Sequence, residues 1–172
     1  IFQLIEKKEK PVYTLGPVIH NEQMISYLEE QGVVTLNSID DIEKIQDKDV
    51  NLIIRAHGIP PKIYDKLKDY GNLSIIDRTC PDVRKIHKLA SKKYKEGYKI
   101  IITGDKKHPE VIGINGECED NAIVINSPED VDSIGELSGK ICVVSQTTFN
   151  QSKWEKIITK LKEKYNNVEF YN

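Results

Sequence analysis

Short apolar runs alternate with helix-patterned segments along the whole chain, and this alternation constrains the fold more than any other feature. Each apolar run ends in glycine, proline or polar residues, as a short strand does. The segments between the runs carry apolar residues at three- and four-residue spacing, which indicates helices. Strands that alternate with helices form parallel sheets with right-handed crossovers. We therefore expect an α/β protein with mostly parallel sheets.

The expected elements follow from these patterns. Strands are predicted at residues 11–15, 33–36, 50–54, 74–76, 99–103, 122–126, 141–144 and 168–170. Helices are predicted at residues 22–31, 38–44, 60–70, 81–95 and 151–164, with another beginning near 127 and a weak one in 111–116, where two glycines count against it. Residues 1–10 resemble the end of a helix. Asn21 is well suited to cap the helix at 22–31.

The strand–helix pattern runs through two halves of similar size that meet near Cys80. A chain of 172 residues is long enough for one large α/β domain or two small ones. We predict two small lobes, residues 1–80 and 81–172, each a three-layer α/β/α sandwich with a mostly parallel sheet.

Composition excludes several classes of partner. The net charge is −2 and charges of both signs are interspersed, whereas a nucleic-acid-binding surface needs a clustered basic excess. No apolar run approaches the roughly 20 residues that span a bilayer. The three cysteines are an odd number, which does not indicate a disulfide framework. We therefore expect no nucleic-acid or membrane partner, and a reducing cytoplasm as the compartment.

Cys80 is predicted to lie at the carboxyl end of a strand and the amino end of a helix, with Pro81 near the first helical position. Unpaired backbone N–H groups and the positive end of the helix dipole meet there. Both stabilise a thiolate, the form that ligates metal or attacks electrophiles. The alternative is a small cysteine that only caps a turn.

Other polar side chains also follow the predicted strands, where ligands bind in open parallel sheets. They are His20, His57, His108 with Glu110, and the run Gln146, Thr147 and Thr148. Each of them could instead be an ordinary loop or helix-capping residue. Together they describe an anion pocket: imidazoles hold a phosphate-like group, while a carboxyl and a hydroxyl group handle protons. His87, inside a helix, and Cys118 and Cys142 are expected to be structural.

Five motifs occur in an order and spacing typical of one family. They are His20-Asn21, Arg55-Ala56-His57-Gly58, Asp77-Arg78-Thr79-Cys80-Pro81, His108-Pro109-Glu110-Val111 and Gln146-Thr147-Thr148. The chain resembles the LytB-type iron–sulfur enzymes, the 4-hydroxy-3-methylbut-2-enyl diphosphate reductases, from about Pro11 to its end. The resemblance implies a three-lobed α/β protein with pseudo-threefold symmetry, in which each lobe gives one cysteine to a central 4Fe–4S cluster.

The resemblance also implies a reaction, the last step of the methylerythritol phosphate route to isoprenoids. In it the allylic hydroxyl group of the substrate leaves as water, giving isopentenyl and dimethylallyl diphosphate. Cys80 would be a cluster ligand, and His20, His57 and His108 would bind the diphosphate or a substrate oxygen. Glu110 would donate a proton, and Thr147 would position the allylic oxygen and relay the proton. The family further implies an electron-donor protein such as ferredoxin or flavodoxin.

Two features of the family are not found in this sequence: its amino-terminal cysteine motif and its third lobe with the third cysteine. Cys118 and Cys142 match no ligand position of the family. We therefore expect a piece carrying the first two lobes, which by itself would hold no intact cluster and would be inactive.

Two other functions remain open from the residues alone. The first is a non-catalytic α/β module that binds diphosphate without iron. The second is an enzyme that uses Cys80 as a nucleophile with a nearby histidine, in which alkylation of Cys80 would abolish turnover.

Overall fold

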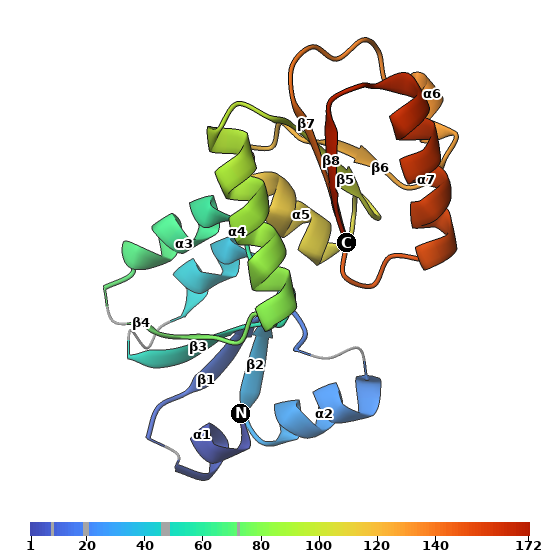
Figure 1. Ribbon diagram of the computed structural model, residues 1–172. Coiled ribbons are helices and arrows are strands. Elements are labelled where there is room, and N and C mark those ends of the chain that lie inside the picture. The colour runs from blue at the N-terminus through green and yellow to red at the C-terminus, as the bar shows by residue number, and fades with distance from the viewer. Residues whose placement is uncertain (8, 19–20, 46–48, 72) are drawn as a thin grey trace. The chain divides into compact units, whose positions relative to one another are not determined.

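The computed structural model describes residues 1–7, 9–18, 21–45, 49–71 and 73–172 (Figure 1). The first half contains α1 (Phe2–Lys7), β1 (Val12–Leu15), α2 (Glu22–Glu30), β2 (Val33–Leu36), the 3-10 helix η1 (Ile39–Lys44), β3 (Val50–Ile54), α3 (Pro61–Lys68) and β4 (Leu73–Asp77). The second half contains α4 (Pro81–Lys95), β5 (Lys99–Thr103), α5 (Pro109–Gly116), β6 (Ile123–Ile125), α6 (Asp130–Ser133), β7 (Ile141–Ser145), α7 (Gln151–Lys164) and β8 (Val168–Tyr171).

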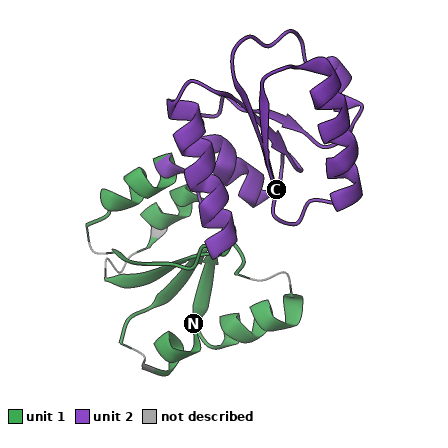
Figure 2. Ribbon diagram, viewed as in Figure 1, with its two compact units in different colours: residues 1–58, 62–80 green, residues 59–61, 81–172 purple. Residues whose placement is uncertain are grey.

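The chain divides into two compact units, which Figure 2 shows in different colours. Unit 1 consists of residues 1–58 and 62–80, and unit 2 of residues 59–61 and 81–172. Each unit is built around its own four-stranded sheet. No helix in the described part of the chain is long and apolar enough to cross a membrane.

Both sheets are parallel throughout and have the same strand order. In unit 1 the order is β2-β1-β3-β4, and in unit 2 it is β6-β5-β7-β8. In each sheet the first strand of the unit therefore lies between the second and the third. The prediction of an α/β fold with mostly parallel sheets is confirmed.

Unit 2 is a three-layer sandwich because successive residues of its central strands point to opposite faces. Ile101 and Val143 pack on one face, against Trp154, Ile157 and Leu161 of α7. The adjacent positions pack on the other face, against α4 and α5. They are Ile100, Ile102, Cys142 and Val144, and they contact Ala90, Val111 and Ile114. A continuous apolar strand such as β7 is thus buried on both faces, as expected of a parallel sheet between helices.

One face of the sheet of unit 1 is covered by α1 and α2. Val12, Val33 and Ile53 form a cluster there with Leu28 of α2, and Leu4 of α1 packs against it. On the opposite side of β3, Leu52 and Ile54 are also fully buried. Strand β3 is therefore buried on both faces, as a nearly continuous apolar strand of a parallel sheet is.

Two local elements differ from the sequence prediction. Residues 39–44 form a 3-10 helix, which begins with a capping box between Ser38 and Asp41. The weakly indicated helix is real and begins earlier than expected, at Pro109. Its second glycine lies close to Pro60, since a Cβ atom on Gly116 would come within 2.6 Å of that ring. Close packing here outweighs the low helix propensity of glycine.

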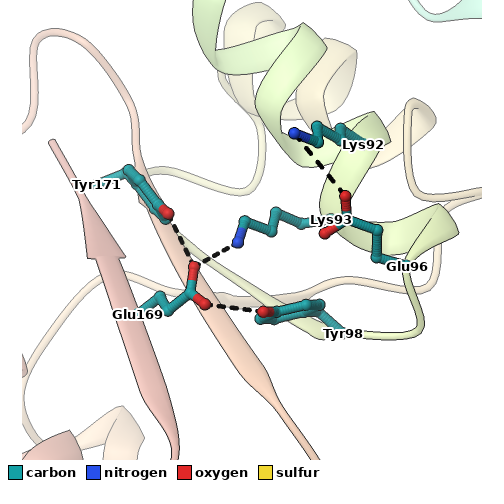
Figure 3. A network of polar contacts seen from close by, with 6 residues as sticks. All are labelled: Lys92, Lys93, Glu96, Tyr98, Glu169 and Tyr171. Atoms are coloured by element: carbon teal, nitrogen blue, oxygen red, sulfur yellow. Dashed lines mark hydrogen bonds and ion pairs between the residues drawn. The ribbon is translucent and has the colours of Figure 1, made fainter.

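The outer strand β8 is joined to α4 by a polar network (Figure 3). Glu169 accepts hydrogen bonds at 2.7 Å from the hydroxyl groups of Tyr98 and Tyr171, and it forms an ion pair with Lys93. These bonds hold the pKa of Glu169 at about 2, below its ordinary value, chiefly through the hydrogen bond from Lys93. The pKa of Lys93 is raised by the same bond.

Candidate functional site

The candidate residues of unit 2 follow β5 and β7, the two neighbouring strands at its centre. Thr103 and Ser145, the last residues of these strands, are partners in the parallel register. The intervening strand β6 pairs on the outer side of β5, so the strand order reverses between β5 and β7. Ligands bind beyond the carboxyl ends of parallel strands at such reversal points. The topology therefore brings the loop at 104–108 next to the loop at 146–150.

The loop after β5 forms a turn that starts α5. The carbonyl of Asp105 accepts a hydrogen bond from the His108 amide at 2.9 Å, and its Oδ1 accepts from the Lys107 amide at 2.9 Å. His108 then caps the helix, because its Nδ1 accepts from the Glu110 amide at 3.2 Å. With Nδ1 accepting, the neutral imidazole carries its hydrogen on Nε2. Pro109 follows at the first turn, where proline is well tolerated.

Glu110 is a buried carboxylate, 1% exposed, whose two oxygens are both bonded to Thr147. The Thr147 amide donates to Oε1 at 2.7 Å, and the Thr147 hydroxyl donates to Oε2 at 2.9 Å. A carboxylate can be buried at acceptable cost only when such donors replace water. Thr147 itself is an exposed residue, so the buried acid is bonded to a residue at the surface of unit 2.

The loop after β7 is fixed by Gln146, which is 8% exposed. Its backbone amide donates to the backbone carbonyl of Thr103 at 2.8 Å, and its backbone carbonyl accepts from the backbone amide of Phe149 at 2.9 Å. Its side chain accepts from the Asp105 amide at 3.1 Å and donates to the Thr148 hydroxyl at 2.9 Å. Gln146 therefore touches both loops of the site.

In unit 1, the segment before Cys80 runs along the end of β3. The Arg78 amide donates to the carbonyl of Ile54 at 3.0 Å, and the Cys80 amide donates to the carbonyl of Ala56 at 2.9 Å. Cys80 is partly exposed and lies beside the peptide that leads into His57. The strand-end position predicted for Cys80 is confirmed, and α4 begins at the next residue, Pro81.

Asp77 stabilises this segment from the end of β4. Its Oδ1 accepts from the Thr79 amide at 2.8 Å and from the Thr79 hydroxyl at 2.5 Å. Its Oδ2 accepts from the hydroxyl of Tyr64 on α3 at 2.7 Å. Asp77 thus fixes the backbone that presents Cys80, and the role of this acid was not predicted from the sequence.

His57 lies in a tight turn after β3, in which the Gly58 amide donates to the carbonyl of Arg55 at 3.1 Å. Gly58 has a φ of +71°, a conformation that glycine adopts without strain. His57 itself is half-buried. Beside this turn the guanidinium of Arg55 covers Gly16 so closely that a Cβ atom there would come within 2.7 Å of Nη1. Burial lowers the pKa of Arg55.

His20 lies outside the described residues. Cys118 and Cys142 are fully buried in the core of unit 2, and burial raises the pKa of their thiols to about 12 and about 11. His87 is buried as well, with its Nδ1 3.3 Å from Oε1 of Glu117. In the described part of the chain, no three residues of the His, Cys, Asp and Glu types are placed to hold a metal ion.

The structure thus brings His108, Glu110 and Thr147 together in unit 2, and places Cys80 beside the His57 turn in unit 1. The Glu110 and Thr147 pair can hold and move a proton between a carboxylate and a hydroxyl group. Sequence reasoning singled out Gln146 only as part of a polar run. The signal that could have found its role is its position directly after a buried strand, one residue before Thr147.

Comparison with known proteins places this geometry in a family. All 172 residues match the family model described as LytB protein. A 4-hydroxy-3-methylbut-2-enyl diphosphate reductase from Clostridioides difficile (strain 630) is 44% identical over 167 residues, which is 96% of this chain and 58% of the relative. The enzyme of the same name from Caldanaerobacter subterraneus is 44% identical over 170 residues, covering 99% of this chain and 58% of that protein.

Solved structures agree. The E-1-hydroxy-2-methyl-but-2-enyl-4-diphosphate reductase from Plasmodium falciparum superposes with a TM-score of 0.88 at 32% identity, covering 99% of this chain and 52% of that one. A structure of (E)-4-hydroxy-3-methyl-but-2-enyl diphosphate reductase gives 0.80 at 32% identity, covering 99% and 59%. The chain spans somewhat more than half the length of these relatives, and it belongs to the LytB protein family.

Proposed function

We propose that the protein containing this chain removes the hydroxyl group of 4-hydroxy-3-methylbut-2-enyl diphosphate by reduction. The products would be isopentenyl and dimethylallyl diphosphate, in the methylerythritol phosphate route to isoprenoids. The names of the relatives support this reaction, at up to 44% identity. The observation on this chain that supports it best is the double hydrogen bond between Thr147 and the buried carboxylate of Glu110.

Glu110 and Thr147 would together deliver a proton to the departing oxygen. When Oε2 of Glu110 is protonated, it donates to Oγ1 of Thr147, and the Thr147 hydroxyl hydrogen turns toward the substrate. One proton then passes from Glu110 to Thr147 while Thr147 gives its own to the substrate hydroxyl, which leaves as water. Glu110 ends ionised and Thr147 neutral. Two electrons and a second proton complete the reduction.

His108 and His57 would bind the anionic part of the substrate, as would His20. The cap at Nδ1 of His108 supports this, because it leaves Nε2–H as the ring's hydrogen-bond donor. Imidazole donors and cations suit phosphate oxygens. We further propose that the two units are the first two lobes, residues 1–80 and 81–172, of a three-lobed protein that works in a reducing cytoplasm with ferredoxin or flavodoxin as electron donor.

A 4Fe–4S cluster would supply electrons and a Lewis-acidic iron when bound. Cys80 fits one ligand position, because it is partly exposed, three residues after the end of β4 and directly before α4. Cys118 and Cys142 do not fit, since both are fully buried among apolar side chains of unit 2. A cluster at Cys80 would therefore take its other ligands from residues other than these two.

The test is an anaerobic assay of the full-length protein with 4-hydroxy-3-methylbut-2-enyl diphosphate and a reduced electron donor, together with an iron and sulfide count. The proposal predicts consumption of the substrate and about four irons per chain, lost together when Cys80 is changed to serine. Tight binding of the diphosphate with no iron and no turnover would instead support the non-catalytic binding module.

A further inference from the structure

The side chain of Gln146 connects the two loops that carry Glu110 and Thr147. Oε1 of Gln146 accepts from the amide of Asp105 in the first loop, at 3.1 Å. Nε2 donates to the hydroxyl of Thr148 in the second loop, at 2.9 Å. Since Asp105 N–H can only donate, it fixes Oε1 as the acceptor and so leaves Nε2 to face Thr148. The side chain at residue 146 must therefore accept a hydrogen bond at one end and donate one at the other.

The space around this amide is shaped to hold it. A Cβ atom on Gly104 would come within 2.9 Å of Oε1 of Gln146 and 2.6 Å of the Val111 side chain. Only glycine fits at residue 104, because any side chain there would overlap Val111 and Gln146. The backbone of Gln146 is also held at both ends, by Thr103 and Phe149. A buried, fully oriented amide of this kind stabilises one arrangement of its neighbours over others.

One end of the Gln146 side-chain amide binds the loop that leads to Glu110, and the other end binds Thr148, the residue after Thr147. Asp105 accepts from His108 and Lys107, so fixing Asp105 fixes the turn that starts α5 and presents Glu110. Thr148 directly follows Thr147 in the chain. The Gln146 side chain therefore holds both the loop that carries Thr147 and the loop that leads to Glu110, and so it fixes the distance between the Thr147 hydroxyl and the Glu110 carboxylate.

We propose that Gln146 is a positioning residue, which holds Thr147 against Glu110 in the geometry that proton transfer requires. This inference rests on the proposed function. It predicts that Gln146 contributes to turnover without contacting the substrate. A misplacement of about 1 Å in such a pair can cost a factor of about 100 in rate.

The first experiment measures hydrogen exchange at the Thr147 amide in the full-length protein, and it does not depend on activity. Gln146→Met removes both side-chain hydrogen bonds of Gln146 while keeping a side chain of similar length. We expect exchange at Thr147 to become at least about tenfold faster, because two hydrogen bonds that hold its loop are lost. Exchange at Ile157 in α7 should not change. Thr148→Ser keeps the accepting oxygen and should retain the wild-type rate, whereas Thr148→Val should not.

The second experiment measures kcat and KM per folded, cluster-loaded molecule. Gln146→Met should lower kcat by about 10- to 100-fold with little change in KM. Gln151→Met, at an exposed glutamine that begins α7, is the control and should leave both unchanged.

Three results would overturn the inference: unchanged exchange at Thr147, a lower melting temperature with kcat preserved, or a rise in KM alone. The second would make Gln146 merely structural, and the third would make it a binding residue. If the wild-type protein shows no turnover, the proposed function fails, while the exchange experiment still tests whether Gln146 positions Thr147.

Discussion

Thr147 donates its amide and its hydroxyl hydrogen to the two oxygens of Glu110, 37 positions earlier in the chain. The pair joins the loop after β5 to the loop after β7, at the point where the strand order of the sheet reverses. Glu110 is only 1% exposed, and Thr147 gives each of its carboxylate oxygens a hydrogen-bond donor. The pair also connects this buried carboxylate to an exposed residue.

The hydroxyl of Thr147 should matter for stability as well as for chemistry. Thr147→Val keeps the shape of the side chain and the amide bond but leaves Oε2 of Glu110 without its hydroxyl donor. We expect the free energy of unfolding of unit 2 to fall by about 1–3 kcal/mol, the cost of a buried acceptor left unpaired. Urea unfolding measures this. Thr147→Ser restores the donor and should recover most of the loss; equal stability of the Val and Ser variants would contradict the assignment.

Gly104 should not tolerate a side chain. In Gly104→Ala the new Cβ atom would lie 2.6 Å from Val111 and 2.9 Å from Gln146, so the loop or the start of α5 must move. Overpacking of this kind costs about 1–3 kcal/mol. Gly135→Ala is the matched control, because a Cβ atom on Gly135 would meet no atom of the described residues within 4 Å. Thermal unfolding compares the melting temperatures of the two variants. An equal fall in both would show that a Cβ atom at residue 104 does not overpack the loop.

The network around Glu169 predicts how stability depends on pH. The pKa of Glu169 is held at about 2 in the folded chain, whereas its ordinary value is 4.5. The stabilisation is therefore fully present above about pH 4.5 and is lost as the pH falls from there toward 2. We expect wild type to be more stable than Glu169→Gln at pH 6 and the difference to shrink toward pH 2. Urea unfolding across this range measures it.

The control for this experiment is Glu163→Gln, at an exposed position of α7. The difference in stability between Glu163→Gln and wild type should stay the same from pH 6 to pH 2. A difference between wild type and Glu169→Gln that stays constant from pH 6 to pH 2 would mean that the ionised form of Glu169 does not stabilise the fold.

The order of elements and the class of fold could be predicted from periodicity alone. Runs such as residues 50–54 and 141–144 are apolar at every or nearly every position, which a strand buried on both faces requires. Helix α5 was only weakly predicted, because propensity penalises Gly113 and Gly116 while the packing of Val111 and Ile114 cannot be read from a single sequence.

The site was predicted by residue type and by position after a strand, but its contacts were not. Glu110 and Thr147 meet only because β5 lies beside β7, although β6 comes between them in the chain. Strand order depends on tertiary packing and cannot be derived from the spacing of apolar residues. For the same reason the sequence showed neither the cap that His108 forms nor the link that Gln146 makes.

The proton transfer from Glu110 is tested by the turnover of Glu110→Gln in the full-length, cluster-loaded protein, measured together with the variant's affinity for the diphosphate substrate. Glutamine can still accept from the Thr147 amide, so the loop geometry should persist while the transferable proton is lost. We predict that kcat falls by about 100- to 10,000-fold and that affinity stays near the wild-type value. Glu163→Gln serves as the control. Near-normal turnover of Glu110→Gln would show that Glu110 does not supply the proton through Thr147.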